Sequence, residues 1–71
     1  MQDEDLIRMA NQIAAFFAPY SEEEAVAGVA NHIKQFWEPR MRTQLFAIAG
    51  GAKDLDPLVR RALEDPALAP A

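Results

Sequence analysis

The sequence contains no cysteine and only one histidine, His32. The absence of cysteine excludes disulfides and thiolate metal sites, and a single histidine cannot provide the ligand set of a structural zinc ion. Nucleophiles are equally scarce, because the chain has one serine, Ser21, and one threonine, Thr43. A histidine that acts as a general base needs an orienting group and a nucleophile within reach. We therefore expect no catalytic residue, no metal site and no cofactor in this chain.

Long apolar runs and positive charge are also lacking. No segment approaches the ~18 continuous apolar residues of a membrane span. The formal net charge of −4 disfavours a protein that binds nucleic acid through phosphate contacts. Residues 3–5 are Asp, Glu and Asp, unlike the basic start of a secretory signal. We expect a cytoplasmic protein that binds neither nucleic acid nor a membrane.

The chain is short. Seventy-one residues form one domain at most, and a domain of this size has a small core. Without disulfides or metal, such domains depend on very regular helix packing, on self-association, or on docking to a larger protein. We expect the isolated chain to be marginally stable or to self-associate.

Helix start and stop signals divide the chain into four helical patterns. Ser21 and Glu24 have the spacing of a capping box, and Pro39 suits the first turn of a helix. Gly50-Gly51 is a stop signal, and Asp56-Pro57 is another start. The predicted helices cover residues 3–17, 22–37, 39–49 and 57–64. The fold class expected is all-α, a small bundle of three main helices plus a short fourth. It forms a single domain over residues 3–65, followed by a disordered Pro/Ala tail at 66–71.

The first helix is apolar over an unusually wide arc. Its large side chains recur at helical spacing and leave only a narrow polar stripe. Such a helix is either central to a bundle or shared between its own core and a partner. Gly28, in the second helix, lowers helix stability by about 1 kcal/mol relative to Ala, and we interpret it as a point of close helix crossing.

Residues 31–42 gather the only Trp, the only His and three of the seven cations around Pro39. Residues 30–53 carry about +3, whereas residues 1–29 carry about −5. Adjacent helical positions differ by about 100°, so Phe36 and Trp37 either both cap the core or point one inward and one outward. Arg40 and Arg42 differ by about 200°, which favours two separate neighbours, an intramolecular carboxylate and a partner. His32 has either a half-buried structural role or an interface role.

Two segments resemble a known family, residues 9–17 (MANQIAAFF) and 32–42 (HIKQFWEPRMR). A third matching piece is Gly50-Gly51 followed by residues 55–59 (LDPLV). Together they are similar to the small delta subunit of the soluble, NAD-dependent, molybdenum-containing formate dehydrogenases of bacteria. The match covers most of residues 6–64. It departs from the family pattern at Glu38, where an Asp is expected, and in the Pro/Ala tail.

The resemblance implies a non-catalytic accessory subunit. Its partner would be the large molybdenum-containing subunit of formate dehydrogenase, whose assembly or stability it would support. The cofactors and the NAD site would lie on other subunits. The alternative is a free-standing helical scaffold or regulatory protein that self-associates through its first helix. Trp and Arg are over-represented at binding hot spots. The expected partner-binding residues are His32, Phe36, Trp37, Arg40 and Arg42, with Phe16, Phe17 and Tyr20 as a second region.

Overall fold

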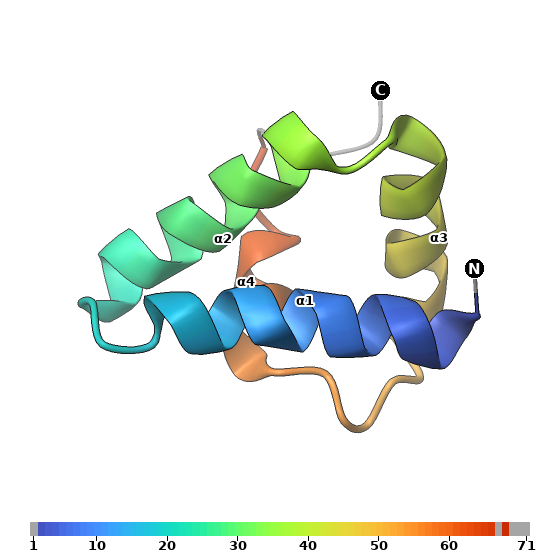
Figure 1. Ribbon diagram of the computed structural model, residues 1–71, viewed down its shortest axis with the longest axis horizontal. Coiled ribbons are helices and arrows are strands. Elements are labelled where there is room, and N and C mark those ends of the chain that lie inside the picture. The colour runs from blue at the N-terminus through green and yellow to red at the C-terminus, as the bar shows by residue number, and fades with distance from the viewer. Residues whose placement is uncertain (1, 67, 69–71) are drawn as a thin grey trace.

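The described part of the chain folds into a bundle of four helices (Figure 1). The computed structural model describes residues 2–66 and residue 68. Within this part of the chain there is no strand, which confirms the predicted all-α class. The elements are α1 (Asp3–Phe17), α2 (Glu22–Phe36), α3 (Pro39–Ala49) and the short α4 (Pro57–Ala62).

Local sequence signals account for most helix boundaries. The Ser21 hydroxyl accepts a hydrogen bond from the backbone N–H of Glu24 at 3.2 Å, as expected for an N-cap. The Asp56 carboxylate accepts from the N–H of Leu58 at 2.9 Å and caps α4 in the same way. Prolines occupy the first turns of α3 and α4, where their missing N–H groups would have no helical partner.

Two predicted ends are too long. α4 ends at Ala62, not at residue 64, because the N–H groups of Glu64 and Asp65 bond to carbonyls only three residues back. Such bonds tighten the chain out of the α-helical path. α2 ends at Phe36, and Trp37 follows as an extended C-cap with φ −89° and ψ 138°.

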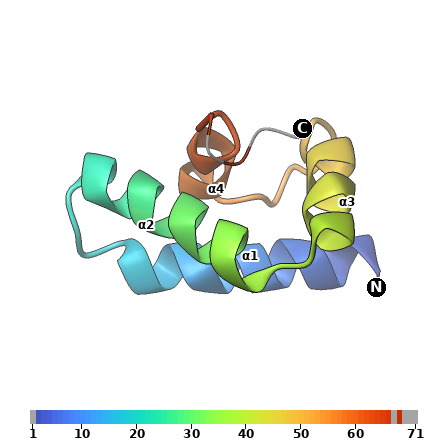
Figure 2. The same ribbon diagram turned by 90° about the horizontal axis from the view of Figure 1, so that it is seen from above.

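The helices form two layers (Figures 1 and 2). α1 and α2 make a V that is closed at the turn between them, and α3 stands across its open end. α4 packs against one side of this V and contacts both α1 and α2. Among the described residues, no helix covers the opposite side of the V.

The core lies where the four helices meet. The largest fully buried side chains are aliphatic: Leu6, Val29, Ile33, Leu45 and Val59. Among the described residues no polar or charged side chain is buried. Leu68 is also buried in this core, although it belongs to the segment expected to be a disordered tail. The other residues of that tail beyond Pro66 lie outside the described residues.

Long-range polar contacts hold the loop before α4. The Asn11 side chain donates to the carbonyl of Asp54 and accepts from the N–H of Asp56, both at 2.8 Å. Arg60 donates to the carbonyl of Ala49 at 2.8 Å and to that of Ala52, so it caps the end of α3.

An ion pair on the surface links α4 to α2. It joins Arg61 to Glu22, and hydrogen bonding and charge from that carboxylate raise the pKa of Arg61. Both side chains are exposed, so the pair contributes little to stability.

None of the helices in the described part of the chain has both the length and the apolar character that a membrane span requires.

Candidate functional site: an aromatic face over the groove between α1 and α2

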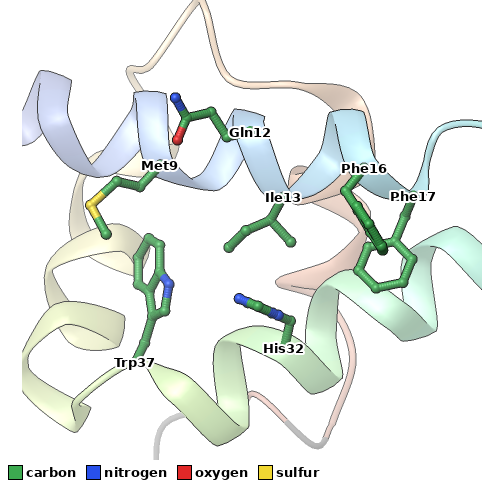
Figure 3. Close-up of a pocket in the computed structure, with 7 residues that line it drawn as sticks. All are labelled: Met9, Gln12, Ile13, Phe16, Phe17, His32 and Trp37. Carbon is green, nitrogen blue, oxygen red and sulfur yellow. The ribbon is translucent and has the colours of Figure 1, made fainter.

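A groove of about 450 Å³ lies between α1 and α2 (Figure 3). It is mainly apolar, and its polar lining side chains are an amide and an imidazole. The lining residues are Met9, Gln12, Ile13, Phe16, Phe17, His32 and Trp37. We call these residues, together with Tyr20 and Phe36, the aromatic face.

The wide apolar arc of α1 is divided between the core and the groove. Leu6, Ala10 and Ala14, spaced four residues apart, are fully buried. Met9 and Ile13 lie next to this row and are only half-buried, because they line the groove. The sequence pattern indicated such sharing between core and surface, but it could not separate the two sets of residues.

Close packing of α1 on α2 closes one end of the groove. A Cβ atom on Gly28 would lie 2.5 Å from Cε1 of Phe17, so the ring of Phe17 sits directly on the glycine. This bears out the interpretation of Gly28 as a close crossing point. The Phe17 ring also meets Phe16 edge to face, with centroids 5.0 Å apart.

The two adjacent aromatics at the end of α2 point in opposite directions. Trp37 is 6% exposed and joins the core, whereas Phe36 is 70% exposed. The extended backbone at Trp37 carries its indole beneath Met9, toward α1 (Figure 3). Of these two residues, only Phe36 offers an exposed ring to a partner.

The three exposed large hydrophobic residues of the described chain all adjoin the groove. Phe16, 69% exposed, lines it directly. Tyr20, 51% exposed, packs on Phe17 with centroids 5.8 Å apart. Phe36 packs on His32 at 4.8 Å. Single exposed apolar residues need no explanation, but a contiguous apolar face marks an interaction site.

His32 is half-buried and points toward Ile13 across the groove (Figure 3). Its ring stacks at a 38° tilt on Phe36. Neither neighbour is a nucleophile or a group that could orient the imidazole for proton transfer. The surroundings suit packing and recognition better than general-base chemistry.

The two arginines that follow Pro39, Arg40 and Arg42, have different roles in the fold. Arg42 is half-buried and donates from Nη1 to the carbonyl of Lys34 at 3.2 Å, which ties α3 to the end of α2. The expected carboxylate partner is therefore replaced by a backbone carbonyl. Arg40 is exposed, and no hydrogen bond or ion pair joins it to another described residue.

The structure brings together most of the residues expected to bind a partner. Phe16, Phe17, Tyr20, His32, Phe36 and Trp37 all belong to the aromatic face. Met9, Gln12 and Ile13 also line it, although the sequence did not single them out as site residues. Their helical spacing to Phe16 is the signal that could have found them. Neither Arg40 nor Arg42 lines the groove.

Comparison with known families agrees with the resemblance seen in the sequence. A family model described as the NADH-dependent formate dehydrogenase delta subunit FdsD matches residues 5–63. The chain belongs to this delta-subunit family. No curated protein and no solved structure that we compared with it matches. The matched residues include α1 to α4 almost completely, and with them the whole aromatic face.

The family description names an NADH-dependent formate dehydrogenase. A nucleotide site would require glycines in a loop that binds phosphates. Gly28 is covered by the Phe17 ring, and Gly50 ends α3 in a right-handed helical conformation. Gly51 follows Gly50 in the turn after α3. None of the three belongs to a loop between a strand and a helix of the kind that cradles phosphates. Among the described residues, no three His, Cys, Asp or Glu side chains are grouped as metal ligands would be. Within the described part of the chain, the donor set fits neither a nucleotide nor a metal ion.

Proposed function

We propose that this chain is a non-catalytic accessory subunit that binds the large, molybdenum-containing subunit of an NAD-dependent formate dehydrogenase. Its role is to support the assembly or the stability of the active enzyme in the cytoplasm. The observation that carries this proposal is the family match over residues 5–63. The contiguous apolar surface of the aromatic face supports it, because a small domain exposes such a surface mainly where a partner covers it.

The chemistry of the chain favours an accessory role. The residues that could move a proton or attack a substrate are few and lie apart: Ser21 at the start of α2, His32 near its other end and Thr43 on α3. Ser21 already serves as the N-cap of α2. We therefore assign the redox chemistry, the molybdenum cofactor and the NAD site to other subunits.

Co-expression tests the proposal directly. The enzyme is produced with and without this chain, and formate-dependent NAD⁺ reduction, molybdenum per large subunit and thermal inactivation are measured. We expect several-fold less active enzyme without the chain, while turnover per bound molybdenum stays the same. Equal yield, equal molybdenum content and equal thermal stability in both preparations would contradict the proposed function. A change in turnover per molybdenum would instead indicate a direct part in catalysis.

A second candidate is a free-standing scaffold protein that self-associates through α1. The exposure of Phe16 and Tyr20 at the end of α1 favours it. The two candidates differ in what a tagged chain retains, which is the large subunit in one case and only further copies of itself in the other.

A further inference from the structure

We propose that the aromatic face is a seat for one amphipathic helix of the partner chain, with large apolar residues along one side and a basic end. This inference rests on the proposed function, and the partner is the large subunit. The helix would lie on the side of the α1–α2 pair opposite α4.

The shape of the site fits a helix. The groove runs between two helices, and α4 covers the pair only from the other side (Figure 2). A helix that binds such a groove inserts apolar side chains spaced three, four and seven residues apart. Met9, Ile13 and Phe16 form one apolar wall at this same spacing, and His32 and Trp37 stand opposite them (Figure 3).

The three exposed aromatic side chains offer too little area for a stable dimer of this chain, although they can support weak association at high concentration. A fully buried aromatic side chain covers ~150–250 Å². At exposures of 69%, 51% and 70%, Phe16, Tyr20 and Phe36 together offer roughly 300–450 Å². A standard interface needs about 800 Å² from each partner. The half-buried lining residues add less per side chain, so the face suits one inserted helix rather than a broad contact between copies.

Charge gives the direction of the helix. No carboxylate lines the groove. Glu22 and Glu23 lie on the α4 side of α2, where they line a hollow with Arg61. Glu24 precedes Gly28 and His32 at four-residue spacing, so it lies on the stripe of α2 that faces the groove, at the end near Tyr20. Glu22 already pairs with Arg61, whereas no ion pair joins Glu24 to another described residue. Complementary charges at the edge of an apolar contact set its orientation and its rate of formation. The end of the partner helix near Tyr20 therefore carries Lys or Arg.

Site-specific photocrosslinking in the whole enzyme tests this proposal. The photoreactive residue p-benzoylphenylalanine replaces Phe16 or Phe36 in the tagged chain, which is co-expressed with the other subunits. Both positions are exposed aromatics, so the substitutions leave the core intact. Ala27, an exposed residue of α2 that does not line the groove, is the control position.

We expect crosslinks from positions 16 and 36 to one helical segment of the large subunit, and none from position 27. Crosslinks to a second copy of the chain, or to a loop or strand, would overturn the proposal. So would crosslinking from position 27 alone. If the unsubstituted chain does not co-purify with the large subunit, the proposed function fails as well. Co-purification without crosslinks at 16 and 36 overturns only the position of the contact.

Substitutions give an independent measure. Phe36→Glu should reduce retention of the large subunit by at least about tenfold, because it places a charge against an apolar partner surface. Ala27→Glu should change retention by less than about twofold, since a residue outside the contact contributes little. Glu24→Lys should weaken retention at low salt and have less effect at high salt. Glu23→Lys, on the α4 side of α2, should change retention little. Equal retention for Phe36→Glu and Ala27→Glu would overturn the proposal.

Discussion

The ring of Phe17 packs directly on Gly28, so that a Cβ atom at that position would lie 2.5 Å from Cε1 and 2.6 Å from Cδ1 of the ring. This contact joins α1 to α2 at the closed end of the V. It also positions the Phe17 ring on which Phe16 and Tyr20 rest, so the aromatic face depends on the absence of a side chain at Gly28.

Gly28→Ala should therefore lower the free energy of unfolding by about 1 kcal/mol. Alanine favours the helix by about 1 kcal/mol, but forcing the aromatic ring away costs about 1–3 kcal/mol. Gly50→Ala is the matched control, because no atom lies within 4 Å of a Cβ there and its φ is −62°. That substitution should stabilise by about 0.4–1 kcal/mol. Urea unfolding measures both, and a stabilised Gly28→Ala protein would show that the ring moves without loss.

Asn11→Ala should reduce the unfolding free energy by about 1–3 kcal/mol. The substitution leaves the part-buried N–H of Asp56 and the carbonyl of Asp54 without their partner, and an unmade bond in such a place costs about that much. Gln12→Ala, at the exposed neighbouring position, should stay within about 0.5 kcal/mol of the original protein. Thermal melts measure the stability of both variants. Equal stability would show that the hydrogen bonds of Asn11 to Asp54 and Asp56 do not stabilise the fold.

Charge reversal at Arg40 and at Arg42 should affect stability and binding differently. Arg42→Glu removes the bond to the Lys34 carbonyl, so the melting temperature should fall together with binding of the large subunit. Arg40 has no such bond, so Arg40→Glu should leave the melting temperature unchanged. Rim charges act mainly on association rate and its salt dependence. If Arg40 faces the partner, Arg40→Glu slows association. Normal stability and normal binding in both variants would remove the arginines from the interface.

The isolated chain should be helical, melt below about 80 °C and associate weakly at high concentration. Its core is small and lacks disulfides, and the aromatic face stays open without a partner. Light scattering over a concentration series, with Phe16→Glu as the comparison, measures this association. The substitution should return the chain to a monomer. A strict monomer that melts above 80 °C would show that the fold does not depend on a partner.

Local signals predicted the helices better than they predicted the contacts between them. Ser21, Pro39 and Asp56 act through groups only a few residues away, so their capping roles can be read from the sequence. The hydrogen bonds of Asn11 to Asp54 and Asp56 join residues that are 43 and 45 positions apart in the sequence. Helical periodicity contains no information about such pairs.

The same limit applies to the candidate site. The sequence indicated that Phe36 and Trp37 lie together just before Pro39, but α2 ends between the two residues. The direction of each ring follows from the extended backbone at Trp37 and not from the helical spacing. Trp37 is therefore a core residue beneath the groove, and Phe36 takes the outward position.

We expect the large subunit of formate dehydrogenase to hold this member of the delta-subunit family in a stable complex. Native mass spectrometry of the material purified through a tag on this chain measures that association. The spectrum should contain a species with the tagged chain and the large subunit, and this species should lose the tagged chain when Phe36→Glu is introduced. Recovery of the tagged chain alone, or only as multiples of itself, from cells that express all the subunits would contradict this expectation.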